Sequence, residues 1–119
     1  MLNILVFLSD NKPYREIFSD IFRLDCIFYS EDEARYSKKL DNDARYFFDY
    51  SKSTLEYSVE ELSQIPYKVS EICDISFYPP EILSSIVSAL ADCDKTIYID
   101  DDHETIASVT EYKKIINIP

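Results

Sequence analysis

The chain has 119 residues, of which 46% are hydrophobic and 14% aromatic, and its formal net charge at pH 7 is −11. This composition excludes a disordered tail, and the excess of carboxylates opposes direct binding to nucleic acid or to an anionic membrane, which depends on lysine and arginine. The chain contains no glycine, which excludes the phosphate-binding loops in which glycine lets the backbone approach the ligand.

The first part of the chain predicts a strand, a helix and a second strand. Residues 2–8 are almost all apolar, which is typical of a strand covered on both faces. Residues 14–24 place apolar side chains three and four positions apart and predict an amphipathic helix, with Pro13 tolerated in its first turn. Residues 26–29 predict a short buried strand. A right-handed crossover through the helix would make the two strands parallel.

The middle of the chain carries weaker patterns. Residues 31–43 hold many charges around few apolar positions and predict a loop or an exposed helix. Two aromatic-rich segments, residues 45–50 and 54–57, predict the two strands of a hairpin. Residues 58–61 (Ser-Val-Glu-Glu) match a capping box, so we expect a short helix there that Pro66 ends.

The last third predicts a strand, a helix and a hairpin that leads into a final helix. Residues 75–78 are strand-like, and the two prolines after them open a helix with one apolar side. That side consists of Ile82, Leu83, Ile86, Val87 and Leu90. Residues 96–99 and 104–107 predict the hairpin, and Ser108 begins a second capping box before a helix through residues 112–116. We therefore expect one α/β domain over residues 1–119, with a mixed central sheet of about five strands and packed helices.

We expect a cytoplasmic protein with no cofactor and no membrane span. The longest apolar run, residues 4–8, is far shorter than the roughly 20 residues that cross a bilayer, and no basic region precedes it. The three cysteines, Cys26, Cys73 and Cys93, are odd in number and widely spaced, so we expect buried thiols rather than disulfides. They form no Cys-x-x-Cys pair, and His103 is the only histidine, so no zinc site is expected.

The acidic run at residues 100–104 (Asp-Asp-Asp-His-Glu) is the strongest local signal for a site. It has three interpretations: a solvated turn, an acidic patch that binds a protein, or a site for magnesium or calcium. The calcium-loop spacing with its turn glycine is missing, which disfavours the metal site. His103 has no nucleophile placed to use it, and the acids beside it raise the pKa expected for its ring, so we expect no catalytic residue.

Tyrosines and acidic residues are the candidates for partner binding. Four of the ten tyrosines, Tyr36, Tyr46, Tyr50 and Tyr57, lie in the middle of the chain among acids, either as interface residues or as sheet core. The residues expected to bind a partner are Asp100, Asp101, Asp102, Glu104, Tyr46, Tyr50 and Tyr57.

Charge is also divided unevenly along the chain. Residues 1–52 hold ten acids and eight bases, whereas residues 53–119 hold thirteen acids and four bases. A field of this kind steers a basic partner toward the acidic part, although solubility explains it as well. These features predict a small acidic protein that binds a basic protein and blocks it, rather than an enzyme.

A family resemblance leads to the same prediction. A small, acidic, glycine-poor chain opens with Leu-Asn-Ile-Leu-Val-Phe-Leu-Ser at residues 2–9 and closes with Tyr-Ile-Asp-Asp-Asp-His-Glu at residues 98–104. In this it resembles the immunity proteins of bacterial polymorphic-toxin systems, such as those of contact-dependent growth inhibition. The resemblance implies a cognate toxin, often a nuclease domain, bound near its active site, and it assigns no role to a particular residue. The alternative is a phage-type inhibitor that mimics nucleic acid and blocks a DNA-binding or defence protein.

Overall fold

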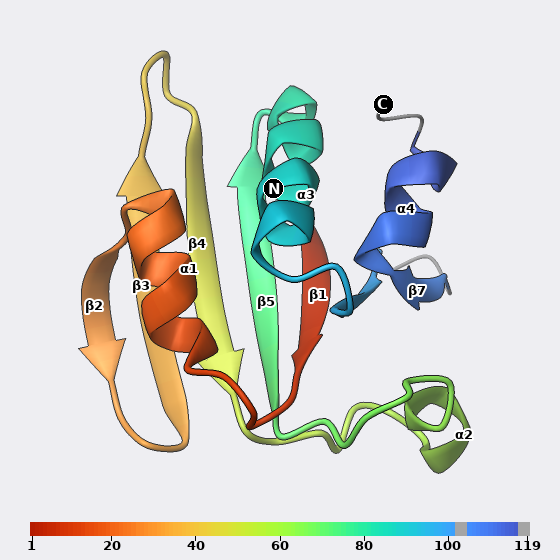
Figure 1. Cartoon of the computed structure of the whole chain (residues 1–119). Coiled ribbons are helices and arrows are strands. Elements are labelled where there is room, and N and C mark those ends of the chain that lie inside the picture. The colour runs from red at the N-terminus through yellow and green to blue at the C-terminus, as the bar shows by residue number, and fades with distance from the viewer. Residues whose placement is uncertain (102–104, 117–119) are drawn as a thin grey trace.

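A computed structural model describes residues 1–101 and 105–116 (Figure 1). The strands in this part of the chain are β1 (Leu2–Leu8), β2 (Asp25–Tyr29), β3 (Glu33–Lys39), β4 (Arg45–Ser51), β5 (Glu71–Tyr78), β6 (Tyr98–Asp100) and β7 (Ile106–Ser108). The helices there are α1 (Tyr14–Phe22), α2 (Val59–Leu62), α3 (Leu83–Cys93) and α4 (Val109–Ile115), and a short 3-10 turn, η1 (Pro80–Ile82), leads into α3.

These strands form one sheet in the order β2-β3-β4-β5-β1-β6-β7. Every neighbouring pair is antiparallel. The prediction of one α/β domain is confirmed, but the mixed sheet of about five strands is wrong, because the described residues form seven strands in an antiparallel sheet. β1 and β2 point the same way, as four successive antiparallel pairings require, yet three other strands lie between them. The predicted parallel orientation is therefore confirmed, although the two strands are not neighbours in the sheet.

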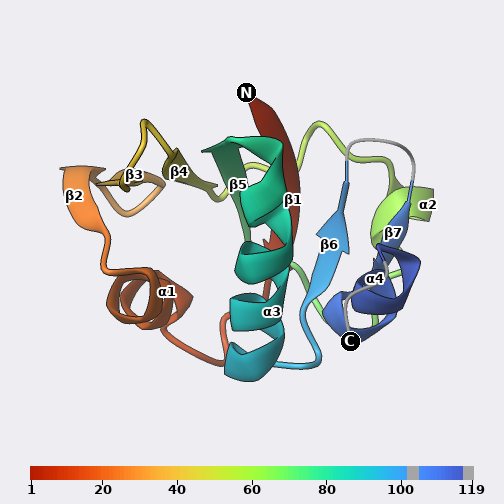
Figure 2. The same ribbon diagram turned by 90° about the horizontal axis from the view of Figure 1, so that it is seen from above.

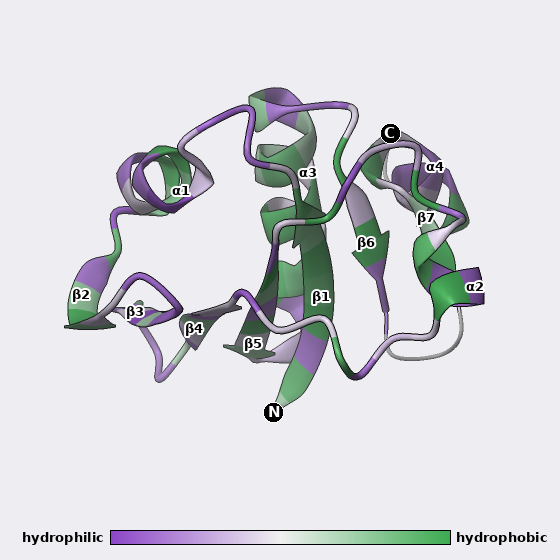
Figure 3. Cartoon of the chain, turned by 90° about the horizontal axis from the view of Figure 1, so that it is seen from below, coloured by the Kyte–Doolittle hydropathy of each residue, from purple (hydrophilic) through white to green (hydrophobic). Residues whose placement is uncertain are grey.

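The main core lies between the sheet and the helices on one side of it, which we call the helix face. Figure 2 shows α1 and α3 on this side of the sheet. Among its largest fully buried side chains are Phe18, Phe48, Phe77, Ile75, Ile86 and Leu90. Figure 3 shows the mostly hydrophobic β1 and β5 running along α3. α4 joins this core through Val109 and Tyr112. The apolar stripe predicted for α3 therefore faces the sheet.

A second, smaller core lies on the opposite face of the sheet. Phe7 and Ile72 point to that face and pack against Ile65, which follows α2. The Tyr67 hydroxyl donates a hydrogen bond to the Phe7 carbonyl oxygen (2.6 Å) and accepts one from the backbone N–H of Tyr98 (2.9 Å). The segment 52–70 is thereby held against β1 and β6, and it covers only that end of the sheet.

Residues 31–57 differ most from their predicted structure. The segment expected to be a loop or an exposed helix contains β3, in which the buried Ala34 and Tyr36 alternate with the exposed Glu33 and Arg35. That two-residue alternation identifies a half-buried strand despite the many charges. The aromatic segment at residues 45–50 is a strand as predicted, but it pairs with β3 and β5. Residues 54–57 form no strand, so the predicted hairpin is wrong.

The capping box predicted for α2 is confirmed, and the one predicted for α4 is formed in part. In α2 the Ser58 hydroxyl accepts a hydrogen bond from the Glu61 backbone N–H (3.1 Å), and the Glu61 carboxylate accepts one from the Ser58 N–H (2.9 Å). Ser108 accepts a hydrogen bond from the Glu111 N–H at the start of α4. Both caps satisfy backbone donors that the first helical turn leaves without partners.

The cysteines are free thiols, as predicted, but only Cys73 is buried. Cys93 is half-buried, and Cys26 is exposed on β2. The expectation of a buried strand at residues 26–29 is also wrong. β2 lies at the edge of the sheet, and every one of its residues is exposed. An apolar strand at the edge of a sheet has the same composition as a buried central strand. The order of the strands in the sheet decides which of them lies at the edge.

Candidate protein-binding face

The sheet presents a partly uncovered surface on the side opposite α1 and α3, which we call the open face. In β4 the side chains of Tyr46, Phe48 and Tyr50 are buried on the helix face, and the alternate residues, including Phe47 and Asp49, are half-buried on the open face. The alternation follows from the two-residue repeat of a strand. Residues of β3 and β5 that pair with Phe47 or Asp49 lie on the open face as well, because paired residues of neighbouring strands point to the same side of a sheet.

A row of residues crosses the open face at right angles to the strands. Cα partners along this row are, in order, Arg35 on β3, Asp49 on β4, Asp74 on β5, Leu5 on β1 and Asp100 on β6. Three of these five residues are aspartates, and Asp49 lies directly opposite Asp74. Like charges placed directly opposite each other on one face of a sheet are destabilising. We call this set the acidic row.

The negative charges of the acidic row are partly compensated by neighbouring side chains. The Arg35 guanidinium nitrogen Nε lies 3.0 Å from Asp49 Oδ1, and about half of the Arg35 side chain is exposed. The Asn3 amide donates a hydrogen bond to Asp74 Oδ1 (3.2 Å). Partial burial raises the pKa of Asp49, and the nearby Arg35 charge opposes that shift. Asp49 therefore pairs with a cation, whereas Asp74 accepts a hydrogen bond from a neutral amide.

Two hollows adjoin the acidic row. The larger, of about 470 Å³, lies between Phe28 on β2 and the segment after β4, and its floor includes Arg35, Asp49 and Asp74. The smaller, of about 340 Å³, is lined by Asn3, Leu5, Glu56, Tyr57, Glu61, Asp74 and Asp100. Carboxylates from the sheet and from the segment 52–70 thus face the same space.

Tyr57 connects this segment to the acidic row. Its hydroxyl donates a hydrogen bond to Asp100 Oδ2 (2.9 Å), and its ring packs edge-on against Phe7, with the ring centroids 5.0 Å apart. Burial and the bond to Asp100 raise the pKa of Tyr57. The phenol therefore stays a neutral donor, and it fixes the segment against β6.

The predicted site residues fall into three groups in the structure. Tyr57 and Asp100 meet at the open face, although Asp100 is only 8% exposed and is not part of a solvated turn. Asp101 is half-buried next to it. Asp102 and Glu104 lie outside the described residues, as does His103.

Tyr46 and Tyr50 lie in the core, which differs from the expectation that they bind a partner. The Tyr46 hydroxyl donates a hydrogen bond to the Phe22 carbonyl oxygen (3.2 Å) beneath α1. Tyr50 is 2% exposed and packs against Tyr36, which is also buried. All three point to the helix face, because the register of β3 and β4 places them there. A partner docking on the open face does not reach these three side chains.

Asp49, Asp74 and Arg35 were not predicted as site residues. The signal was present in the alternation of residues 45–51 and 71–78, where single acids occupy the positions between buried apolar residues. That pattern places each acid on the outer face of its own strand. It does not say that the two acids are neighbours, because this depends on the register between strands 25 residues apart.

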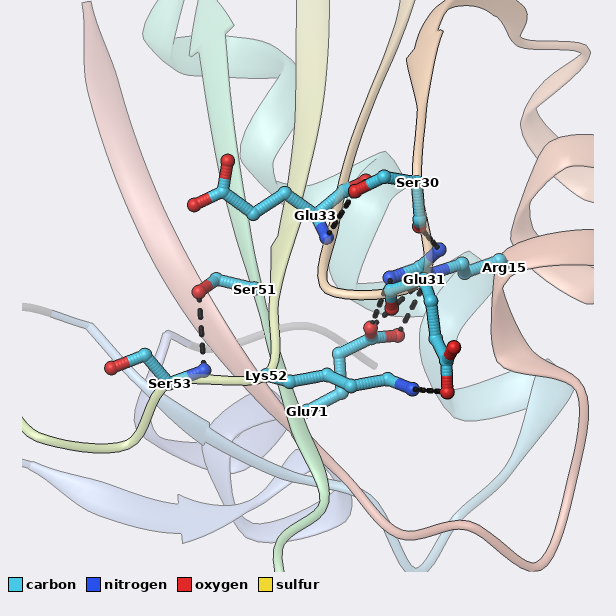
Figure 4. Close-up of polar contacts among 8 residues, drawn as sticks. All are labelled: Arg15, Ser30, Glu31, Glu33, Ser51, Lys52, Ser53 and Glu71. Atoms are coloured by element: carbon cyan, nitrogen blue, oxygen red, sulfur yellow. Dashed lines mark hydrogen bonds and ion pairs between the residues drawn. The ribbon is translucent and has the colours of Figure 1, made fainter.

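A second polar cluster, beside the start of α1, has a structural role (Figure 4). The Arg15 guanidinium binds both carboxylate oxygens of Glu71 and donates hydrogen bonds to the carbonyl oxygens of Ser30 and Glu31. The Lys52 ammonium lies 3.7 Å from a Glu31 carboxylate oxygen. Arg15 is only 8% exposed. Its donors are used to join α1, β5 and the turn between β2 and β3, so we assign it no ligand.

Comparison of the chain with protein families, with curated proteins and with solved structures gives no match. No helix in the described ranges is long and apolar enough to pass through a bilayer. Within residues 1–101 and 105–116, no three histidine, cysteine, aspartate or glutamate side chains form a group that could hold a metal ion.

Proposed function

We propose that this chain is a protein-binding inhibitor whose open face docks on a basic protein. The observation that carries the proposal is the acidic row, in which Asp49 and Asp74 are direct neighbours and half-exposed on the face opposite α1 and α3. Asp49 pairs with Arg35 and Asp74 accepts a hydrogen bond from Asn3, but two like charges placed directly opposite each other still weaken a sheet. A basic partner would offset the repulsion between the two carboxylates, so their placement is explained if they bind such a partner.

The shape of the open face favours a protein over a small molecule. Its hollows are shallow and lie side by side over several strands, with Phe28 and Leu5 among the carboxylates. Apolar contacts inside a rim of charges are typical of protein interfaces. The charges would raise the rate of encounter, and the apolar residues would supply contact area after docking.

The kind of partner follows from charge and from the family resemblance. A net charge of −11 complements a protein that is basic because its substrate is a polyanion. We therefore propose the immunity protein of a toxin system, with a nuclease toxin domain as its partner. The acidic row and the hydrogen-bonded pair of Tyr57 and Asp100 would cover the substrate-binding surface of that domain.

The test begins with the genes beside this one, among which the proposal expects a gene for a basic toxin domain. We expect the chain to bind that domain and to protect bacteria that express it. Replacing two charges with amides, as Asp49→Asn and Asp74→Asn together, should weaken binding by about 10- to 100-fold, mainly through slower association at low salt. Association rates at low and high salt and growth on co-expression measure the two effects.

The matched control is the pair Asp20→Asn and Asp92→Asn, two exposed carboxylates on α1 and α3. It changes the net charge by the same amount on the helix face, and we expect nearly unchanged binding. Equal weakening in both double variants would show that net charge alone matters and would contradict the assignment of the open face. A neighbouring gene without a toxin domain, or a basic domain that the chain does not bind, would contradict the proposed function.

A further inference from the structure

One edge of the sheet is apolar and uncovered. β2 is the edge strand, with β3 as its only neighbour among the described residues. Ile27, Phe28 and Tyr29 are 59%, 50% and 58% exposed. An edge strand with exposed apolar side chains is a template for pairing with another strand, and monomeric proteins usually protect such edges with lysine, with proline or by a covering segment. The β2 sequence, Asp-Cys-Ile-Phe-Tyr, contains neither lysine nor proline.

The ribbon of β2 and β3 has a basic end and an acidic end. Arg23, Lys38 and Lys39 lie where β2 begins and β3 ends, with Asp25 beside them and Asp41 and Asp43 in the turn that follows β3. Glu31, Asp32 and Glu33 lie at the turn between the two strands, where Lys52 pairs with Glu31 and leaves an excess of acid. Residues 23–39 hold four acids and four bases, whereas the whole chain has a net charge of −11. The ribbon is therefore a neutral part of an acidic molecule.

We propose that two copies of this chain pair through β2, antiparallel, about a two-fold axis at Ile27. Antiparallel pairing centred on that residue brings the Arg23 end of each strand to the Glu31 end of the other, so the basic end of one ribbon meets the acidic end of its copy. Parallel pairing would set like charges together, which is unfavourable. At the axis, Ile27 of one copy contacts Ile27 of the other. Because both copies use the same edge, the contact is complete in a dimer and does not lead to larger assemblies. This inference does not depend on the proposed function.

The geometry of β2 also sets the strength of this contact. Cys26 pairs with Tyr36 and Phe28 pairs with Arg35, so Ile27 is the extra residue of a β-bulge. A short, bulged strand offers few ladder hydrogen bonds, so burial of apolar side chains carries the association. The two copies also repel each other through their net charge. We therefore expect a weak, reversible dimer that becomes stronger as salt screens the repulsion.

Sedimentation velocity over a concentration series tests the dimer, with a reductant present because Cys26 is exposed. The expected result is a dimer fraction that rises with concentration and with salt. Ile27→Lys, which places two ammonium groups at the axis, should weaken dimerisation by about tenfold or more. The matched control is Leu55→Lys, because Leu55 is 92% exposed and lies outside the edge strand, in the segment 52–70. It changes charge and apolar surface in the same way and should leave the dimer intact.

A charge exchange tests the orientation of the two copies. Arg23→Glu sets acid against acid and Glu31→Arg sets base against base, so each variant alone should dimerise about tenfold less than the original chain. A mixture of the two variants restores an opposite pair at both ends and should form a heterodimer. Circular dichroism melts establish that all variants fold.

Four results would overturn the proposal. They are a monomer at every concentration, an equal loss of dimer in Leu55→Lys, growth of larger open-ended assemblies, and a mixture of Arg23→Glu and Glu31→Arg that associates no better than either variant. The first three contradict a closed contact through β2, and the last contradicts its antiparallel orientation. Binding of the basic toxin domain is measured separately, so failure of one proposal leaves the other to its own test.

Discussion

Asp94, directly after α3, shows how a single buried residue joins distant parts of this chain. Its carboxylate accepts hydrogen bonds from the backbone N–H (2.9 Å) and the hydroxyl (2.6 Å) of Thr96, and from the Tyr14 hydroxyl (2.8 Å). The Lys12 ammonium lies 3.1 Å from the same group. Burial alone would raise the pKa of Asp94, but the bonds from Thr96, and then those from Tyr14 and Lys12, lower it to about 2. The ionised carboxylate thus holds the start of α1 against the end of α3.

This arrangement predicts a dependence of stability on pH. The pKa of an aspartate in an unfolded chain is about 3.9, so the contribution of Asp94 is complete above roughly pH 4 and is lost as the pH falls toward 2. We expect Asp94→Asn to lower the free energy of unfolding by about 2 kcal/mol at neutral pH and by much less near pH 2. Urea unfolding of both proteins at several pH values measures the difference.

The control for this prediction is Asp92→Asn, which removes an exposed carboxylate from the same helix. Its effect on the free energy of unfolding should be small at every pH. A deficit in Asp94→Asn that stays constant between neutral pH and pH 2 would show that the charge of Asp94 is not the cause.

At the scale of elements, local sequence signals define each helix and tertiary contacts hold it. α1 ends at Arg23, which adopts a left-handed conformation (φ 54°) and donates its backbone N–H to the Ser19 carbonyl oxygen. Glycine usually takes this position, and in a chain without glycine an arginine takes it at a conformational cost. α3 has no side-chain cap, and its buried apolar stripe supplies its stability instead. Helices this short depend mostly on such packing.

The stripe of α3 carries the second prediction. Ile86 is 1% exposed between the helix and the sheet. Ile86→Asp buries a carboxylate without a partner, which costs several kcal/mol, comparable to the whole stability of a small domain. We expect this variant to be unfolded at room temperature by circular dichroism. Ser85→Asp, one position away on the exposed side of α3, should melt within a few degrees of the original protein, and equal loss in both would contradict the burial of this stripe.

At the scale of the whole molecule, excess negative charge opposes compactness. Repulsion among carboxylates falls as salt is added, so the free energy of unfolding should rise between low and moderate ionic strength. The acidic row concentrates this repulsion on the open face. If that face binds a partner, as proposed, its aspartates lower the free energy of unfolding in exchange for binding. Such a trade-off between stability and function is common in proteins.

Asp74→Asn tests this relation. The amide keeps an oxygen that accepts the Asn3 hydrogen bond and removes the charge opposite Asp49. We expect the free energy of unfolding to rise by several tenths of a kcal/mol at low salt and by less at high salt. Chemical denaturation at two salt concentrations measures this, with Asp92→Asn as the control of equal charge. A loss of stability, or the same gain in both variants, would show that repulsion between Asp49 and Asp74 does not destabilise the sheet.

The sequence by itself determined the elements whose signals are local. The amphipathic spacing of α1, the capping box of α2, the stripe of α3, and the hairpin of β6 and β7 leading into α4 were all predicted and are confirmed. Each depends on side chains within a few positions of one another, so composition and spacing were sufficient.

Only the tertiary structure decided which strands are neighbours. It placed β2 at an edge, turned Tyr46 and Tyr50 into the core, and set Asp49 beside Asp74. A strand's alternation tells which residues share a face but not what lies across from them, and a shift of one residue in register would exchange the two faces. The candidate site arises from pairing between strands far apart in the chain, and no local pattern of residues contains that information.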